Sequence, residues 1–122
     1  MSFNRVTLLG TVADISDFEE EPSIHRPAKF IIMTVNKYRK GNGKPDYIPD
    51  FHHVWFYSKK VMNDLITLKT GSNVFVDGHL KTHRNKNKDG TTTYLTYISA
   101  SRVDLMNDTQ EQNLIGMVRK WK

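Results

Sequence analysis

The 122-residue sequence contains no cysteine, and this absence removes several kinds of chemistry at once. Without thiols the chain can form no disulfide, no thiolate metal site and no cysteine nucleophile. It also lacks a run of about 18 apolar residues, which a membrane-spanning helix requires. The first ten residues, MSFNRVTLLG, carry no basic region followed by a continuous apolar stretch, so we expect no secretory signal. These absences fit a protein of a reducing compartment.

Catalytic and metal-binding signatures are missing as well. His52 and His53 are adjacent, so in a strand they would point to opposite faces and could not bind one ion together. His79 and His83 have no acidic or cysteine companion at ligand spacing. The acids form no paired-carboxylate pattern, and the stretch GNGK lacks the spacing of a phosphate-binding loop. We therefore expect no enzyme, no metal and no cofactor, with a metal-dependent nuclease as a distant alternative.

The charge of the chain is positive and unevenly distributed. The net charge is +5, and the length suits one compact domain. Residues 13–21 hold five acids and no base, whereas residues 22–106 hold 14 Lys and Arg against 6 Asp and Glu. A basic body with an acidic segment near its start suggests a polyanionic partner. Ordinary solubility charge is the alternative explanation for the charge alone.

Hydrophobic alternation with a period of two predicts five strands. They span residues 4–12, 28–38, 51–57, 73–83 and 91–106. The second of these is apolar on both faces, so its outer face needs a cover such as another subunit. Residues 13–28 and 39–50 have the composition of loops, and residues 84–90 that of a hairpin turn.

Glycines and small residues mark particular points within these strands. Gly10 predicts a bulge or a close approach of two backbones. The last strand is expected to be interrupted at its small residues, 99–101. In the fourth strand, alternation predicts four inward-facing residues, Val74, Val76, Gly78 and Leu80.

In one segment between the third and fourth strands, the apolar residues follow the spacing of a helix instead of that of a strand. Val61, Leu65 and Leu68 lie at i, i+4 and i+7, and Gly71 follows as a C-terminal cap, so residues 59–71 are predicted to form a short helix. Three strands, one helix and a two-stranded hairpin are the layout of the OB-fold, an all-β five-stranded barrel. An immunoglobulin-like sandwich would need about seven strands and no helix.

The barrel is expected to occupy residues 1–106, which leaves residues 107–122 as a C-terminal tail. The tail has apolar residues at helical spacing, Leu114, Met117, Val118 and Trp121. It predicts an amphipathic helix weakened by Gly116, with a frayed terminus as the alternative.

The segment DFHHVWFYSKK, residues 50–60, places aromatic side chains on the face opposite the core. Alternation turns Val54 and Phe56 inward, and it turns four residues outward: Phe51, His53, Trp55 and Tyr57. Exposed aromatic rings need a cover, which another protein or the flat faces of nucleobases could provide. Stacking of a base on an aromatic ring contributes about 1–3 kcal/mol and tolerates any base.

The spacing of these rings favours an extended ligand. Phe51 and Tyr57 would lie roughly 20 Å apart along a strand, which suits separate nucleotides of one chain. Tyr38, at the end of the second strand, is a third candidate for stacking. Trp55 lies nearer the strand centre, where an interface or core role is as plausible as stacking.

Basic residues gather beside these aromatic positions. One group surrounds Tyr38 in the connection between strands two and three, and another lies in the hairpin between strands four and five. Arg5, on the outward side of the first strand, would extend the same track. The candidate phosphate-binding residues are Arg5, Lys37, Arg39, Lys40, Lys44, Lys81, Arg84, Lys86 and Lys88.

From about residue 3 to residue 106 the chain resembles the single-stranded DNA-binding protein family of bacteria, phages and mitochondria. The stretches that carry the likeness are NRVTLLGTV, FIIMTVNKY, DFHHVWFYSKK and LKTGSNVFVDGHLKTH, in that order. The resemblance implies an OB-fold, usually a homotetramer, that coats single-stranded DNA without strong sequence preference in replication, recombination and repair. It also implies a bacterial or phage-infected cytoplasm, or alternatively the mitochondrial matrix.

The resemblance assigns roles to individual positions. Tyr38, Phe51 and Tyr57 match stacking aromatics of the family, and Arg5 matches a basic DNA-contacting position. His52 matches a histidine that the family tends to use at the subunit interface. The hairpin position where bacterial members often carry a further stacking tryptophan corresponds to Asn85.

The C-terminal sequence differs from that of bacterial members, which usually end in an acidic tip that recruits other proteins. This chain ends in VRKWK, which is basic, so recruitment by that route is in doubt. A second hypothesis keeps the fold and changes the class of protein. In it the chain is a primosome-type or scaffolding OB-fold protein whose aromatic face mainly binds protein partners.

Overall fold

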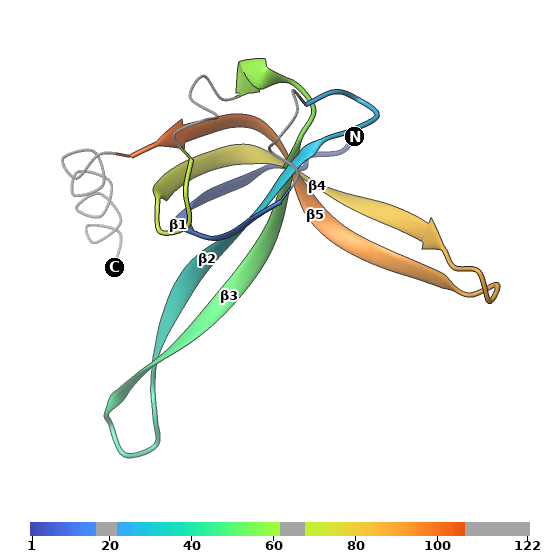
Figure 1. Cartoon of the computed structure of the whole chain (residues 1–122). Helices are drawn as coiled ribbons and strands as arrows, with labels where there is room; N and C mark the ends of the chain where they lie inside the picture. The colour runs from blue at the N-terminus through green and yellow to red at the C-terminus, as the bar shows by residue number, and fades with distance from the viewer. Residues whose placement is uncertain (17–21, 62–67, 107–122) are drawn as a thin grey trace.

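Five strands make up most of the regular structure in the residues that the computed structural model describes, 1–16, 22–61 and 68–106. They are β1 (Val6–Ser16), β2 (Ala28–Arg39), β3 (Pro45–Phe56), β4 (Asn73–Lys86) and β5 (Thr92–Leu105). The strands close into a barrel in the order β1-β2-β3-β5-β4 (Figure 1). The β3–β5 pair is parallel, and the other neighbours are antiparallel. The prediction of an all-β, five-stranded OB-fold barrel is confirmed.

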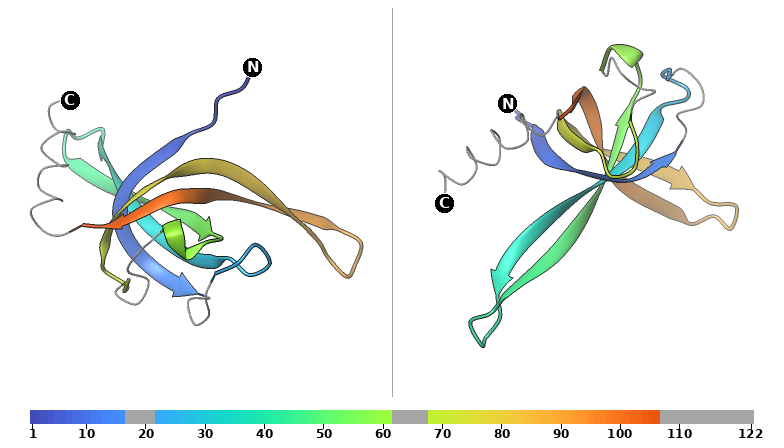
Figure 2. Two further views of the ribbon diagram at one scale, coloured as in Figure 1. Left: turned by 90° about the horizontal axis from the view of Figure 1, so that it is seen from above. Right: turned by 60° about the vertical axis from the view of Figure 1, so that its left-hand side comes forward.

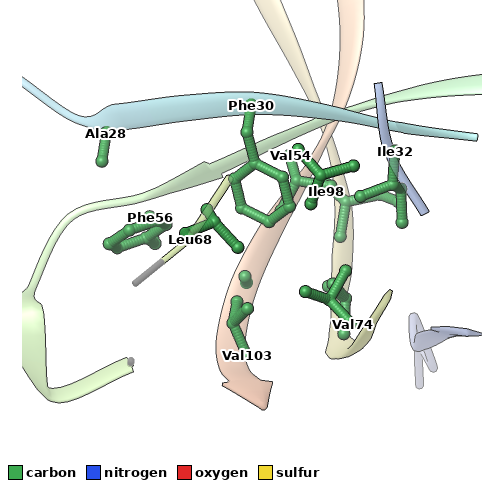
Figure 3. Close-up of a cluster of buried hydrophobic side chains, with 12 residues drawn as sticks. Ala28, Phe30, Ile32, Val54, Phe56, Leu68, Val74, Ile98 and Val103 are labelled. Atoms are coloured by element: carbon green, nitrogen blue, oxygen red, sulfur yellow. The ribbon is translucent and has the colours of Figure 1, made fainter. Parts of the chain in front are cut away.

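The core lies inside the barrel and receives side chains from all five strands (Figure 3). Phe30 of β2 and Phe56 of β3 are its largest members, with ring centroids 6.2 Å apart and ring planes at 68°, an edge-to-face contact. The other core residues are smaller: Val12, Ala28, Ile32, Val54, Leu68, Val74, Val76, Ile98, Ala100 and Val103. Alternation along the strands predicted this inward set because each strand has one face in the barrel.

A β-bulge carries β1 past its predicted end. The register between β1 and β2 shifts between Val12 and Asp14, which leaves one extra residue in β1. The extra residue reverses the alternation, so that Val12 and Ile15 both pack against the core. The predicted loop over residues 13–28 was therefore wrong for residues 13–16, which continue the strand.

Strands β2 and β3 leave the barrel together as a long hairpin, which we call the β2–β3 arm (residues 35–50). Buried and half-buried residues alternate along the first part of β2, whereas its last five residues are all exposed. The antiparallel pairing nevertheless continues to Arg39 opposite Pro45. The prediction of a loop over residues 39–50 was thus wrong for residues 45–50, which are strand.

Two prolines in β3 explain why this stretch looks like a loop in the sequence. Pro45 and Pro49 lie four residues apart, so the backbone nitrogens of both prolines point to the same edge of β3, the one that faces away from β2. On that edge, β3 pairs with β5 only at Val54 and Trp55. The missing N–H groups therefore remove no rung of the ladder, as is usual for prolines in edge strands.

Strands β4 and β5 form a second hairpin, the β4–β5 arm (residues 80–96). Leu80, which alternation turns inward, is 47% exposed, so this prediction was wrong. The reason is its position, because β4 leaves the barrel after Gly78, whereas β5 stays in contact with the core as far as Ile98, the residue paired with Leu80. The arm ends in the predicted hairpin turn, in which the Asn87 amide donates to the Thr91 carbonyl at 2.8 Å.

Gly78 lies where the backbone of β4 comes very close to that of β5. A Cβ atom at this position would lie 2.2 Å from the carbonyl oxygen of Ser99, a separation that no side chain tolerates. One residue further on, β5 contains a β-bulge, since Asp77 faces Arg102 and Gly78 faces Ala100. The predicted interruption of the last strand is therefore a bulge within a continuous strand. Gly10 makes a similar close approach, to the backbone of β2.

The connection between β3 and β4 is described only in part. It begins with a short 3₁₀ helix, η1 (Lys59–Val61), and Leu68 and Val61 pack on the core. The central part of the predicted 59–71 helix, residues 62–67, lies outside the described residues, as does the predicted tail helix over 107–122. None of the helices in the described part of the chain is long and apolar enough to cross a membrane.

Candidate nucleic-acid interface

The two arms leave the barrel in different directions (Figure 2). A groove lies near the point where they separate. Phe51 of β3 lines this groove opposite Leu80 and Thr96 of the β4–β5 arm. A second groove, between Trp55 and the β4–β5 arm, is lined by Lys29, His83, Asn85, Tyr94 and Leu95 among others. Both grooves pass along β3, the strand in which the sequence places its outward-facing aromatic residues.

The β2–β3 arm has two chemically different faces, because paired residues of antiparallel strands share a face. One face carries the odd-numbered residues of both strands, and we call it the basic face. It continues the face of Phe51, the residue next to the arm, which is 59% exposed, and it carries Tyr47, also 59% exposed, opposite Lys37. Arg39 lies one step further out on the same face. Two exposed rings and two exposed cations therefore share this face, with Val35 and Pro49 between the rings.

The opposite face of the arm carries acids. Tyr38 lies there, and its hydroxyl donates to Asp46 at 2.9 Å, while the Lys40 ammonium lies 3.4 Å from the same carboxylate. The hydrogen bond to Asp46 raises the pKa of Tyr38, and the Tyr47 amide and the Tyr38 hydroxyl lower the pKa of Asp46. Asp50 lies on this acidic face as well. Tyr38 thus shares no face with Phe51, although the sequence places both beside basic residues.

Tyr47 is a functional candidate that the sequence analysis missed. Its segment has the composition of a loop, so the alternation from Phe51 through Pro49 to Tyr47 was not followed. Both prolines occupy positions that an edge strand tolerates, so extending the period-two pattern through them would have found Tyr47. It stands roughly 13 Å from Phe51 along the strand.

Trp55 is covered within its own chain and is only 8% exposed. Tyr97 stacks on one face of the indole, with centroids 4.1 Å apart and planes at 20°. The Lys29 ammonium lies 4.4 Å from the ring centroid and covers the opposite face of the indole, because Tyr97 occupies the first face. His83 approaches the ring at 5.4 Å. A base could reach the ring of Trp55 only if Lys29 moved.

Tyr57 is half-buried just beyond the end of β3. Its hydroxyl lies 2.9 Å from the hydroxyl of Tyr97, so the two tyrosines are joined by one hydrogen bond. Burial, followed by this bond, raises the pKa of Tyr57 to about 12. Tyr97 therefore links Trp55 and Tyr57 into one aromatic cluster, a contact between β3 and β5 that no local pattern in the sequence reveals.

The β4–β5 arm is basic along its length. Lys81, Arg84, Lys86 and Lys88 are all exposed, as the sequence predicts for a hairpin tip. Tyr94 lies directly opposite Arg84 and is exposed too, a candidate that the sequence analysis missed. Its position has the inward parity of β5, so alternation assigns it to the core. It is exposed for the same reason as Leu80, because the arm has left the barrel.

Arg5 is exposed but already has a partner. Its guanidinium donates two hydrogen bonds to the Asp77 carboxylate, from Nε to Oδ1 at 3.1 Å and from Nη2 to Oδ2 at 3.2 Å. Thr7 donates a third, at 2.9 Å. The bonds from Arg5 and Thr7 lower the pKa of Asp77. A phosphate at Arg5 must therefore compete with a carboxylate.

The two adjacent histidines lie on opposite faces of β3, as expected. His52 has the parity of the core residues Val54 and Phe56, and its Nε2 lies 2.8 Å from the hydroxyl of Thr34. His53 has the parity of Phe51. Both contribute to the groove that Phe51 lines. In the described part of the chain, no group of three or more His, Cys, Asp or Glu side chains could hold a metal ion.

A closed five-stranded barrel with two basic, aromatic-bearing arms defines an OB-fold protein of the oligonucleotide-binding kind. The Single-strand binding protein family matches residues 3–106, and the chain belongs to this family. Members of the family are DNA-binding proteins without enzymatic activity, which confirms the prediction that the chain is not an enzyme.

Relatives and solved structures agree with this assignment. The chain is 23% identical over 121 residues to single-stranded DNA-binding protein 1 of Xylella fastidiosa, covering 97% of this chain and 88% of that protein. It is 28% identical over 107 residues to single-stranded DNA-binding protein 3 of Listeria innocua, covering 88% and 66%. A Plasmodium falciparum SSB in complex with ssDNA has the same fold, with a TM-score of 0.68 at 22% identity, covering 87% of this chain and 95% of that one.

Proposed function

We propose that the chain binds single-stranded DNA without strong sequence preference, in the groove between its two arms and along the basic face of the β2–β3 arm. The observation that carries this proposal is the pairing of exposed rings with exposed cations on one face. Phe51 and Tyr47 lie on the face that also carries Lys37 and Arg39, and Phe51 lines the groove opposite the basic β4–β5 arm. Exposed rings beside cations suit a chain that offers bases and phosphates in alternation.

In this proposal bases stack on the exposed rings while phosphates contact the arms. Phe51 and Tyr47 are the leading stacking residues, and Tyr94 would accept a base on the other arm. Each phosphate contact releases counterions, so binding should weaken as salt is added. The phosphate contacts are assigned to the predicted basic set: Arg5, Lys37, Arg39, Lys40, Lys44, Lys81, Arg84, Lys86 and Lys88.

Three of the residues that were predicted to stack on bases are assigned smaller roles in binding. The hydroxyl of Tyr38 is bonded to Asp46, which also pairs with Lys40, and Tyr38 shares its face with Asp50, whose charge would repel a phosphate, so we rank it below Tyr47. Trp55 and Tyr57 are tied to Tyr97, and we assign them mainly to holding the groove in shape. A base at Trp55 would first have to displace the ammonium of Lys29.

The cellular role follows from the binding activity. A protein that coats exposed single strands would act in replication, recombination and repair, and we propose this role here. We also propose a homo-oligomer, with His52 at or near the interface. The hollow that Met33 and Val35 of β2 line with Leu9 of β1 is a surface that another copy could cover, and because Met33 and Val35 share the face of Phe51, such a copy would lie beside the proposed DNA path.

The test is a titration of the full chain with fluorescently labelled oligo(dT), read by anisotropy at 50 and 200 mM salt. With about four phosphate contacts, the affinity should fall roughly 50-fold over this range. The matched pair Tyr47→Ala and Tyr38→Ala compares the two faces of one arm. We expect Tyr47→Ala to weaken binding about fivefold or more, and Tyr38→Ala to weaken it less.

Two results would contradict the proposal. Binding that ignores salt would exclude phosphate contacts, and equal effects of the two tyrosine substitutions would exclude the basic face as the DNA path. Weak oligonucleotide binding, together with protein partners that stay bound after nuclease treatment, would instead favour the scaffolding hypothesis. Mass measurement of the free and bound protein in the same buffers tests the oligomer.

A further inference from the structure

Trp55 holds a lysine in a defined position. Tyr97 lies against one face of the indole, with ring centroids 4.1 Å apart, and the Lys29 ammonium lies over the other face, 4.4 Å from the centroid. Among the aromatic side chains, tryptophan attracts an ammonium most strongly. The Tyr97 hydroxyl is in turn 2.9 Å from that of Tyr57, so the indole is fixed against β5 and offers only its other face. Lys29 is half-buried in this position.

The register of β2 and β3 places Lys29 on the face that carries Phe51. Lys29 is paired with Trp55 and Met33 with Phe51, and paired residues of antiparallel strands share a face. The same face recurs at every second residue, so this row continues outward to Lys37 on the β2–β3 arm. Lys29 and Lys37 lie roughly 26 Å apart along β2. Lys29 is therefore the cation at the barrel end of the proposed DNA path.

Lys29 and Trp55 also line the second groove, between β3 and the β4–β5 arm. Other residues that line this groove come from the arm, and they include the polar residues His83, Asn85 and Thr93. His83 brings the arm close to the indole, with its ring centroid 5.4 Å away. An ammonium beside amide, hydroxyl and imidazole groups suits a phosphate diester, whose oxygens accept from all of them.

We propose that Lys29 binds a phosphate of single-stranded DNA in the second groove, and that Trp55 is the positioning residue that holds its ammonium there. A lysine loses side-chain freedom when it binds a phosphate, and Lys29 has already lost part of it by packing on the indole. The ring attracts the charge of the ammonium and not one particular N–H group, so Lys29 can contact a phosphate while it stays on Trp55. The inference rests on the proposed function and deepens it, because it adds Lys29 to the basic residues assigned above.

The same geometry defines the competing role for Lys29. With Tyr97 on one face and Lys29 on the other, a base can stack on Trp55 only after the ammonium has left the ring. In that role Lys29 is a cover that opposes binding, whereas in the proposed role it is a contact that supports binding. The two roles predict opposite effects when the ammonium is removed, so one substitution separates them.

The test compares two substitutions that change the net charge equally. Lys29→Gln removes the ammonium from the groove, whereas Lys60→Gln removes an exposed one from η1, at a position that lines neither groove. One phosphate contact on a single strand contributes about 0.7 to the slope of log affinity against log salt. Relative to a reference of about 1 M salt, Lys29→Gln should therefore weaken oligo(dT) binding about eightfold at 50 mM and about threefold at 200 mM. Lys60→Gln should weaken binding less at both salt concentrations.

A double-mutant cycle tests the role of Trp55. Trp55→Phe keeps a ring at this position but attracts a cation less strongly, so it should weaken oligo(dT) binding about two- to threefold. In the Lys29→Gln background it should have no effect, because no ammonium remains to be held. A purely structural Trp55 would give the same loss in both backgrounds. Lys29→Arg, which keeps the charge and also stacks on an indole, should retain the affinity within about twofold.

A second measurement uses the unaltered sequence and does not depend on the folding of a variant that lacks the ammonium. In ¹³C-lysine-labelled protein, the ring current of the indole should displace the ε-methylene resonance of Lys29 upfield. The resonance is assigned by its loss in Lys29→Arg. When oligo(dT) is added, it should shift as the phosphate binds but remain upfield of the exposed lysines, because the ammonium stays on the ring.

Several results would overturn this inference. They are equal losses in Lys29→Gln and Lys60→Gln, equal losses from Trp55→Phe in both backgrounds, and a Lys29 resonance that does not move. Tighter binding by Lys29→Gln, or a resonance that moves to the position of an exposed lysine, would overturn it in favour of the covering role. In all these cases a wild type that still binds oligo(dT) in a salt-dependent way leaves the proposed function standing. A wild type that binds no oligo(dT) at all overturns both.

Discussion

Two phenylalanines of one strand allow binding and stability to be separated. Phe51 and Phe56 both lie in β3, but Phe51 is 59% exposed and lines the groove, whereas Phe56 is completely buried against Phe30. Phe51→Ala removes a stacking platform worth about 1–3 kcal/mol, which corresponds to roughly a 5- to 150-fold loss of affinity. Because the ring is exposed, the free energy of unfolding should change by no more than about 0.5 kcal/mol.

Phe56→Ala should have the opposite profile. Removing a buried ring leaves a cavity and costs about 3–5 kcal/mol, a large part of the stability of a small domain. The assay is urea unfolding for stability, paired with oligo(dT) anisotropy at a temperature where both variants remain folded. Affinity per folded molecule should fall for Phe51→Ala and stay within about twofold for Phe56→Ala. Loss of stability without loss of affinity in Phe51→Ala would refute the assignment of this ring to the DNA path.

Two further predictions concern the barrel and its aromatic cluster. Gly78→Ala should destabilise the fold by about 1–3 kcal/mol, since its Cβ would meet the Ser99 carbonyl at 2.2 Å, whereas Gly41→Ala, with open space around it, should have little effect; equal melting temperatures would contradict the close crossing. The raised pKa of Tyr57, about 12, favours its neutral form in the folded state, so stability should be fully present below pH 10 and fall as the pH rises toward 12. Tyr57→Phe should remove both this fall and the tyrosinate absorbance near pH 12, and an unchanged titration would exclude the shift.

The barrel could be predicted from the sequence because its strands have one buried face. Phe30, Ile32, Val54, Phe56 and Val74 all follow the period-two pattern and all lie in the core. The pattern weakens only where a bulge resets it, as at the end of β1 and in the middle of β5. Bulges insert a residue without a distinctive composition, so the positions of strand ends were less accurate than the existence of the strands.

The arms could not be predicted in the same way, because they have no buried face. Once a two-stranded ribbon leaves the core, alternation no longer separates inside from outside. Leu80 and Tyr94 have inward parity and are nevertheless exposed, and Tyr47 lies in a stretch whose prolines suggest a loop. What fixes the faces of the β2–β3 arm is its register, with Met33 opposite Phe51, which is a long-range property of the folded chain.

The same reasoning explains why the candidate site was located correctly as a region and incompletely as a set of residues. Charge and aromatic content identified both hairpins, since composition does not depend on register. The assignment of Tyr38 and Phe51 to one surface needed the register, and the structure separates them onto opposite faces. The cover over Trp55 needed the contact with Tyr97, which lies 42 positions away in the sequence.

The position of one arm relative to the other depends on the contacts of β5 with its two neighbours, β3 and β4. On one side, β5 pairs with β3 only at Val54 and Trp55, so the β2–β3 arm is free of β5 beyond these residues. On the other side, the backbone of Ser99 lies against Gly78, immediately before the β4–β5 arm begins. A side chain at position 78 would push these strands apart and so move Leu80 relative to Phe51 across the groove. Barrel stability and the width of the groove therefore depend on the same backbone contact.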